Sequence, residues 1–405
     1  MKRQIPRISE ASRKYVEQVL DFGFHNCSSP GISARLEKSF AEKFGVGYAI
    51  LHCNGTATMH SALIAAGVGV GDEVIVPGLT MASTAFVALH VNAIPIFVDI
   101  DPDTFTIDPA DIRRKVTPRT KAIIPVSIYG LSPDMDAISD IAREHNLTVI
   151  EDNAECFLGY YKGRLVGTMG HMASFSFQAS KHMTCGDGGI LITDDEELAF
   201  KSRRAAVLGY SAISPKPGQS TIPEELRCHP TFARHTELGY NFRMPEIASA
   251  VALGDLERLE ELVEMRQACA RILDDVVKSC SWIKPQAVPD GYINSYWTYA
   301  AYLSYGAPDW AAFRAKFVVL GGDGFYGCWL PVYREPAFRN LSAIVEADPT
   351  RYPQYAGILP DYRKTDCPVV DRLQPKIIQL KTNYFNLDDA EREAEILAAT
   401  IRFFS

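Results

Sequence analysis

Residues 174–189 read SFSFQASKHMTCGDGG, and this stretch combines a strand with a turn that could carry chemistry. The alternation of serine and phenylalanine over Ser174–Phe177 is typical of a β-strand. A polar turn with a single lysine, Lys181, follows the strand, and a glycine cluster at Gly186–Gly189 comes directly after it. An amine on such a turn can form a Schiff base with a carbonyl cofactor. The alternative is a solvated loop lysine, because most lysines lie at the protein surface.

Two further turns precede this stretch, and each lies at the end of a predicted strand. Residues 54–58, NGTAT, follow one strand and open a predicted helix, where free backbone N–H groups and the helix dipole favour a phosphate. Residues 149–155, VIEDNAE, form a buried strand that ends in carboxylates, and Asp152 there could pair with a protonated pyridine nitrogen. Both turns have an ordinary alternative, since a capped glycine turn and an N-cap aspartate fit the same residues.

Around these turns the chain alternates predicted strands with predicted helices, from about residue 48 to residue 194. We expect strands at Tyr48–His52, Glu73–Val76, Ile94–Asp99, Ala122–Ile128, Leu147–Glu151, Ala173–Phe177 and Gly189–Thr193. We expect helices at Ala57–Ala66, Thr84–Val91, Asp134–Asn146 and Glu196–Arg204. Such alternation predicts an α/β fold with a mostly parallel central sheet, whose ligand would bind at the carboxyl ends of the strands.

The sequence from residue 210 onward predicts a long loop and a second, smaller domain. Residues 210–237 are rich in Pro, Ser, Gly and His and lack periodicity, so we expect a loop there. Residues 247–277 predict one long helix between the domains, and residues 388–403 predict a terminal amphipathic helix. We therefore divide the chain into a large α/β domain over residues 1–260 and a smaller α+β domain over residues 261–405.

The composition excludes several classes of protein. The 405 residues are 47% hydrophobic and 22% charged, which is typical of a globular protein with a sizeable core. Lys and Arg number 41 against 49 Asp and Glu, and this charge of −8 argues against a dedicated nucleic-acid binder. The nine cysteines form no C-x-x-C pair, so we expect neither a zinc site nor a disulfide framework. We also expect no signal peptide and no membrane span, and hence a cytoplasmic enzyme.

The order of the three turns resembles that of the PLP-dependent aminotransferases of fold type I. More specifically, the chain resembles the DegT/DnrJ/EryC1/StrS family of sugar aminotransferases, and the resemblance is clearest over residues 30–260. Further matches to this family are Pro30-Gly31 with Leu36-Glu37, GDEVIVP at residues 71–77, GYNFRM at residues 239–244, and Cys367-Pro368. The resemblance implies the fold of a type I PLP-dependent transferase. The cofactor would be pyridoxal 5′-phosphate (PLP), which becomes pyridoxamine phosphate (PMP) while it carries the amino group.

The resemblance also implies a role for each matching residue. Lys181 would hold PLP and then move a proton between the substrate α-carbon and the cofactor C4′. Asp152 would keep the pyridine nitrogen protonated. Asn241 would reach the phosphate of the neighbouring subunit's cofactor, so we expect a homodimer with shared active sites. The residues expected to bind the cofactor are Gly55, Thr56, Ala57, Met81, Asp152, Glu155, Ser176, Lys181 and Asn241.

Three positions depart from the family pattern. Met81 lies where family members commonly place an aromatic residue that stacks on the cofactor ring, and a thioether can still pack there. Glu155 lies where Gln or His is frequent, so we expect it to be protonated or to point away from the ring oxygen. Residues 295–299, SYWTY, lack the histidine that family members often have near this point. We expect this difference to change the substrate pocket and not the chemistry.

The family's chemistry implies transamination in two steps. An amino acid, glutamate as in the family, would give its amino group to the cofactor, which would then pass it to a keto-sugar, typically a nucleotide-linked keto-deoxysugar. A dehydratase branch has histidine in place of the lysine. Here Lys181 is retained and His182 follows it, so we rank transamination above sugar dehydration and above a non-catalytic regulatory role.

Four basic residues are candidates for binding a substrate diphosphate, and of these we favour Arg243. The others are Arg234, Lys162 and Arg164. For each of the four, a surface salt bridge is the ordinary alternative. We expect small-molecule substrates, with no nucleic acid and no membrane as partner.

Overall fold

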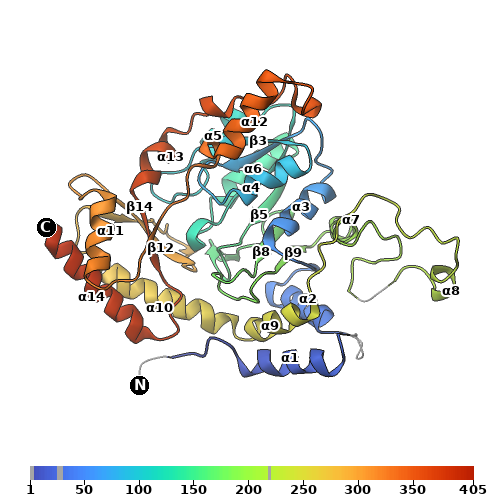
Figure 1. Ribbon diagram of the computed structural model, residues 1–405, viewed down its shortest axis with the longest axis horizontal. Helices are drawn as coiled ribbons and strands as arrows, with labels where there is room; N and C mark the ends of the chain where they lie inside the picture. The colour runs from blue at the N-terminus through green and yellow to red at the C-terminus, as the bar shows by residue number, and fades with distance from the viewer. Residues whose placement is uncertain (1–3, 25–30, 218–219) are drawn as a thin grey trace.

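A seven-stranded sheet forms the centre of the computed structural model, which describes residues 4–24, 31–217 and 220–405 (Figure 1). Its strands, in spatial order, are β1 (Tyr48–His52), β9 (Gly189–Thr193), β8 (Met172–Ser176), β5 (Thr148–Asp152), β4 (Thr120–Ile123), β2 (Glu73–Pro77) and β3 (Ile94–Val98). Every neighbouring pair from β8 to β3 is parallel, whereas β9 runs antiparallel to both of its neighbours. The predicted α/β fold with a mostly parallel sheet is confirmed. The predicted match at Pro30 lies outside the described residues.

Helices cover both faces of this sheet. The alternating side chains of strand β2 pack into hydrophobic clusters on opposite faces. In β2, Val74 and Val76 pack into one hydrophobic cluster, while Ile75 packs into another. The first face is covered by α3 (Gly55–Ala65) and α4 (Ser83–His90), and the second by α5 (Pro109–Lys115) and α6 (Met135–His145). Because both faces are buried, these strands are nearly continuous runs of apolar residues.

One predicted helix is two helices in the structure. Residues 247–277 form α9 (Glu246–Leu256) and α10 (Leu259–Val277), so the prediction of one unbroken helix was wrong. The break lies at Arg258, whose φ of −119° and ψ of 22° are not helical. Its guanidinium bonds the Asp255 carboxylate and the carbonyls of Pro6 and Arg7, so tertiary contacts fix a bend that the apolar periodicity does not record.

The N-terminal and C-terminal parts of the chain pack on this frame. Helices α1 (Glu10–Asp21) and α2 (Ile32–Phe44) lie beside α9, and α7 (Glu196–Ala206) beside α3. A second, antiparallel sheet has the strand order β10 (Ile283–Pro285), β12 (Thr298–Leu303), β14 (Ile377–Lys381) and β13 (Tyr326–Gly327). It packs with α10, α11 (Trp310–Val319) and α14 (Leu387–Phe404) around a separate core. The smaller C-terminal α+β arrangement is thus confirmed, while the boundary at residue 260 stays a prediction.

Residues 332–373 add no strand to that second sheet, and they pack on the large one. This segment includes α12 (Pro336–Ala347) and α13 (Pro368–Leu373). Phe338 lies edge-on to Phe97 of β3, and the backbone N–H of Val369 donates to Asp99 at 2.8 Å. The shorter elements are β6 (Tyr160–Tyr161), β7 (Arg164–Leu165), β11 (Tyr292–Ile293), α8 (Glu224–Arg227) and 3-10 turns at Ile128–Gly130, Val332–Arg334, Pro353–Tyr355, Tyr362–Lys364 and Gln374–Lys376.

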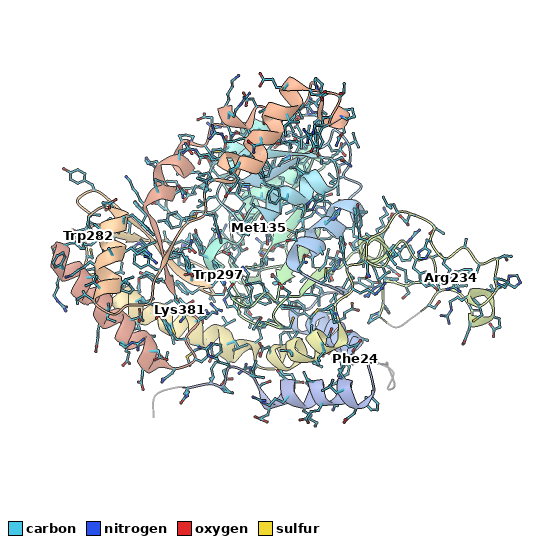
Figure 2. The ribbon with its side chains drawn as sticks, viewed as in Figure 1. Phe24, Met135, Arg234, Trp282, Trp297 and Lys381 are labelled. Carbon is cyan, nitrogen blue, oxygen red and sulfur yellow. The ribbon has the colours of Figure 1, made fainter. Side chains whose placement is uncertain are left out.

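The segment predicted as a long loop projects from the body of the protein. Figure 2 shows Arg234 on this projection, far from Trp297 at the centre of the molecule. Within the described residues of this segment, the only helix is the single turn α8. In the described part of the chain, no helix is long and apolar enough to cross a bilayer. The same residues contain no group of three or more His, Cys, Asp or Glu side chains arranged to hold a metal ion.

Two buried histidines, His52 at the end of β1 and His60 within α3, predict a pH-dependent stability. His52 is fully buried, and its Nδ1 and Nε2 lie 3.0 Å from the Ile50 carbonyl and 2.9 Å from Ser61 Oγ. Burial lowers the pKa of His52 from 6.5 to about 4, and that of His60 falls similarly. The unfolded chain therefore takes up these protons first as the pH falls. We expect His52 alone to cost about 3 kcal/mol of stability between pH 6.5 and pH 4, with no further loss below that range.

Urea unfolding of the wild type and His52→Gln between pH 8 and pH 4.5 measures this contribution. The glutamine can bond similar partners but does not titrate, so its stability curve should be flatter in this window. The comparison is necessary because buried carboxyl groups with a raised pKa, such as Asp152, change stability in the opposite sense. His229→Gln, at an exposed histidine, serves as the control. Parallel curves for wild type and His52→Gln would contradict the assignment.

Candidate active site

A cavity of about 410 Å³ lies at the carboxyl ends of β5 and β8 and the start of α3. Seven of the predicted site residues line it: Gly55, Thr56, Met81, Asp152, Glu155, Ser176 and Lys181. These residues come from four separate stretches of sequence, three of which are the predicted turns, and the parallel sheet brings the ends of those stretches to one edge. The cavity is therefore where the three predicted turns meet.

Lys181 lies on the turn that follows β8, and its side chain is only 13% exposed. Its Nζ lies 3.5 Å from Glu155 Oε1 and 4.4 Å from the centre of the Trp297 ring. Among the described residues that line the cavity, Lys181 alone has a basic side chain. The ordinary alternative of a solvated loop lysine does not describe this placement. The amine is held between a carboxylate and an aromatic face.

Asp152 ends β5 and is buried, with 3% of its surface exposed. One carboxylate oxygen accepts from Thr84 Oγ1 at 2.8 Å, and the other accepts from the Ala154 N–H at 3.2 Å. Burial raises the pKa of Asp152, while Thr84, the Ala154 N–H and the charge of Lys181 oppose that rise. The side chain caps no helix, so the N-cap alternative does not hold. A buried carboxylate of this kind would be stabilised by a cationic group in the cavity.

Glu155 connects the lysine to the backbone of the neighbouring turn. Its Oε2 accepts from the Tyr129 N–H at 3.0 Å, and its Oε1 faces Lys181. Burial raises the pKa of Glu155, and the positive charge of Lys181 is the largest influence that opposes this rise. Tyr129 has a φ of +59°, a conformation that is unusual for a bulky residue. This conformation accompanies the turn that presents the Tyr129 N–H to the carboxylate.

The phosphate-binding turn predicted at residues 54–58 is the first turn of α3. Asn54 caps the helix, because its side chain accepts from the Ala57 N–H at 2.8 Å. The cap and the phosphate prediction are compatible, since the N–H groups of Gly55 and Thr56 donate to no acceptor in the described part of the chain. A Cβ on Gly189 would lie 2.7 Å from the Asn54 carbonyl carbon, so β9 approaches this turn as closely as only glycine permits.

Three predicted site residues do not line the cavity of this chain: Ala57, which is buried, and Asn241 and Arg243. Asn241 and Arg243 are exposed. Their segment is bonded to the residue that precedes the Asn54 cap of α3, since the Cys53 N–H donates to the Phe242 carbonyl at 2.7 Å. Among the other basic candidates, Lys162 and Arg164 form ion pairs with Asp136 at the surface. The salt-bridge alternative is therefore observed for these two.

His182 faces away from the cavity. It is buried, its Nε2 lies 2.9 Å from the Ser295 carbonyl, and its ring packs near Phe157. Burial holds the pKa of His182 well below its usual value, so the ring is neutral. It therefore does not replace Lys181 in the cavity.

Sequence reasoning missed three contributors to the site. Thr84 holds Asp152, Tyr129 holds Glu155, and Trp329 lines the cavity beside Trp297, at a ring distance of 6.0 Å. None of the three belongs to a motif. The only sequence signal for Thr84 was its position, one helical turn after Thr80. Nothing in the sequence indicates that Trp329 lies beside Trp297.

Comparison with known proteins agrees with this geometry. The sequence model of the DegT/DnrJ/EryC1/StrS aminotransferase family matches residues 6–347. The GDP-perosamine synthase of Caulobacter vibrioides is 41% identical over 263 residues, which cover 65% of this chain and 66% of that protein. The L-glutamine:2-deoxy-scyllo-inosose aminotransferase of Streptomyces lividus is 32% identical over 386 residues, which cover 93% of this chain and 88% of that protein.

The solved structure of an aminotransferase from Psychrobacter cryohalolentis has the same fold. It is 27% identical, with a TM-score of 0.83, and the match covers 100% of this chain and 98% of the other. The match includes the C-terminal sheet and its helices, where the sequence motifs are sparse. The fold comparison therefore covers the whole chain, whereas the family model covers residues 6–347.

Proposed function

The chain belongs to the DegT/DnrJ/EryC1/StrS aminotransferase family, and we propose that it moves an amino group from L-glutamate to a nucleotide-linked keto-sugar, with PLP as the cofactor. The observation that carries this proposal is the placement of Lys181. A buried amine lies in the same cavity as a buried carboxylate, Asp152, and a helix N-terminus with free N–H groups. These three features match the carbonyl, the ring nitrogen and the phosphate of PLP.

The residues present fit this cofactor. The backbone amides of Gly55, Thr56 and Ala57 with the Ser176 hydroxyl would hold its phosphate, although the Ala57 amide already donates to Asn54. Asp152 would pair with the ring nitrogen, and its burial leaves the carboxylate in need of a cation. Met81, 52% exposed at the mouth of the cavity, would pack on the ring. When bound, PLP supplies an electron sink that makes the α-proton of an amino acid removable.

This chain's own residues supply the proton transfer and the orientation. Lys181 Nζ would take the α-proton of the donor and deliver it to the cofactor C4′, and with the acceptor it would make the reverse transfer, from C4′ to the carbon that becomes aminated. Contacts with Glu155 and the Trp297 ring hold the amine in one place in the cavity. Proton transfer would therefore occur from that side of the bound substrate. Trp297 and Trp329 form an aromatic wall, on which the apolar face of a sugar ring can pack.

The acceptor class rests on the relatives. The GDP-perosamine synthase similarity supports a nucleotide-linked keto-sugar, and the inosose aminotransferase similarity supports a free keto-cyclitol. Those aminotransferases are named for L-glutamine, so glutamine is the second donor to be tested.

The test incubates the protein with PLP, either donor and either a GDP-linked 4-keto-sugar or scyllo-inosose, followed by mass spectrometry. We expect an acceptor whose keto oxygen is replaced by an amine, and release of the donor's keto acid, with ¹⁵N passing from donor to product. Loss of water without ¹⁵N incorporation would support a sugar dehydratase instead. Absence of both turnover and a Lys181-dependent absorbance band with PLP would leave the regulatory role.

We also propose that the enzyme is a homodimer with shared active sites, in which Asn241 reaches the partner's cavity. The support is the exposure of Asn241 and Arg243 on a segment fixed beside the phosphate-binding turn, outside this chain's own cavity. In that arrangement Arg243 would bring positive charge to a cavity whose own described lining has three carboxylates and one lysine. The diphosphate of a nucleotide-linked acceptor needs such a cation.

Mixing two inactive variants tests the sharing of sites. We expect Lys181→Ala and Asn241→Asp each to be inactive, because the first lacks the amine and the second places a carboxylate beside a phosphate. After the subunits are mixed and exchanged, half of the dimers carry both defects in one site and none in the other. Activity should then recover to about a quarter of the wild-type value. No recovery, despite subunit exchange shown by native mass spectrometry, would overturn the shared site.

A further inference from the structure

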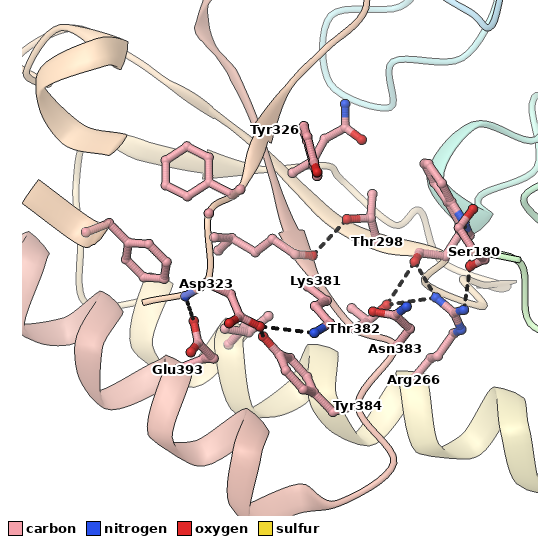
Figure 3. Close-up of a pocket in the computed structure, with 17 residues that line it drawn as sticks. Ser180, Arg266, Thr298, Asp323, Tyr326, Lys381, Thr382, Asn383, Tyr384 and Glu393 are labelled. Carbon is pink, nitrogen blue, oxygen red and sulfur yellow. Dashed lines mark hydrogen bonds and ion pairs between the residues drawn. The ribbon is translucent and has the colours of Figure 1, made fainter. Parts of the chain in front are cut away.

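Arg266 lies behind the turn that carries Lys181, at the wall between the active-site cavity and a second pocket. It belongs to α10 and is 6% exposed. Figure 3 shows the Arg266 guanidinium reaching from α10 toward Ser180. Ser180 and Trp297 line both the second pocket and the cavity, so Arg266 contacts the wall that the two share.

The guanidinium binds three segments of the chain at once. Its Nη2 donates to the carbonyls of Ser180 at 2.7 Å and Lys181 at 2.8 Å. Its Nη1 donates to the Trp297 carbonyl at 2.7 Å and approaches Thr382 Oγ1 at 3.5 Å. The Trp297 indole N–H also donates to the Ser180 carbonyl, at 3.0 Å. The Lys181 turn is thus tied to the start of β12 and the end of β14.

Stability alone does not account for this arrangement. In the described part of the chain no carboxylate forms an ion pair with Arg266, so a full positive charge is buried against carbonyl dipoles. Burial lowers the pKa of Arg266 to about 10, which still leaves it protonated at neutral pH. Apolar residues of similar volume often stabilise a core as well as or better than buried charged groups. What Arg266 adds is five rigid donors in one plane, which can hold several backbone carbonyls in fixed relative positions.

We propose that Arg266 is a positioning residue that clamps the Ser180 and Lys181 carbonyls to the C-terminal sheet, so that the Lys181 amine stays between Glu155 and the Trp297 ring. The clamp acts on the backbone at both ends of this contact. It holds the residue that carries the amine and the residue that carries the ring. Gln178 and Ala179 of this turn are exposed, and among the described residues the other charged group that bonds the backbone of the turn is the Asp255 carboxylate, which accepts from the Thr184 N–H at 3.1 Å, three residues beyond Lys181.

The inference rests on the proposed function for its effect on catalysis, but its structural part can be tested without the cofactor. Hydrogen exchange is measured on the protein without PLP, in wild type, Arg266→Gln, Arg266→Lys and the control Arg271→Gln, which changes an exposed arginine of the same helix. We expect the turn amides of Lys181 and Cys185 to exchange about tenfold faster in Arg266→Gln and at the wild-type rate in Arg271→Gln. Wild-type exchange in Arg266→Gln would overturn the clamp.

Kinetics then test the positioning role. In Arg266→Gln we expect kcat to fall by about 10²-fold while KM for the amino donor stays within about threefold, because the amine is misplaced and the substrate pocket is intact. Arg266→Lys keeps the charge but cannot reach all of these acceptors, so its kcat should fall by about tenfold. If Arg266→Gln does not fold, Arg266→Lys decides, and wild-type exchange and kcat in that variant overturn the proposal. If the wild type itself transfers no amino group, the proposed function fails, and the exchange data alone decide whether the clamp exists.

Discussion

Replacing Lys181 with alanine should abolish amino transfer, with a fall in kcat of about 10⁴-fold or more. The variant loses both the covalent attachment of PLP and the base that moves the α-proton. Among the described residues that line the cavity, no other basic side chain can take over either task. The measurement is the rate of keto acid release from L-glutamate, together with the absorbance band that PLP develops on the protein. Both should disappear in the variant.

The controls for this prediction separate chemistry from folding. Lys162→Ala removes an exposed lysine that pairs with Asp136, and it should keep full activity. Lys181→Ala leaves the Glu155 carboxylate buried without its cation, which further raises the pKa of Glu155 and lets it become neutral. Urea unfolding should therefore show a folded protein. A small amine such as methylamine should partly restore proton transfer. Retention of a few per cent of activity without added amine would contradict the assignment.

The fold was predictable where local pattern and tertiary structure agree. The strands around Val74–Val76 are apolar on both faces, so they indicated a covered, parallel sheet before any contact was known. The bend at Arg258 was not predictable, because it depends on carbonyls of Pro6 and Arg7 that lie about 250 residues away in the sequence. The return of residues 332–373 to the large sheet depends in the same way on long-range packing, such as Phe338 on Phe97.

The candidate site followed the same division. Lys181, Asp152 and the turn at residues 54–58 were found because each lies at a strand end and carries a distinctive residue type. Trp329, which lines the cavity, and Tyr129, which donates to Glu155, were not found, because each belongs to a distant segment whose own sequence has no motif. Glu155 was noticed for its departure from the family pattern. That Glu155 pairs with Lys181 became apparent only from the structure.

Replacing Asp152 with asparagine should lower kcat by about 10³-fold and leave the protein at least as stable as the wild type. The amide keeps an oxygen that can accept from Thr84, so the local structure is retained. It cannot neutralise a protonated pyridine nitrogen, so the ring loses its strength as an electron sink. Because burial already raises the pKa of Asp152, the ionised form is disfavoured by its surroundings, and a neutral amide removes that cost. Steady-state kinetics and urea unfolding measure the two effects separately.

Glu151→Gln is the matched control, since the neighbouring carboxylate points to the other side of the strand. Its oxygens accept from the N–H groups of Gly167, Met169 and Gly170 at 2.6–2.8 Å, and a glutamine amide would oppose at least one of these donors. We expect Glu151→Gln to lose about 2 kcal/mol of stability and to keep a kcat near that of the wild type at a temperature where it stays folded. The two adjacent carboxylates should thus show opposite outcomes. If both variants lose stability and activity together, Asp152 acts as a structural group, and its role at the pyridine nitrogen is refuted.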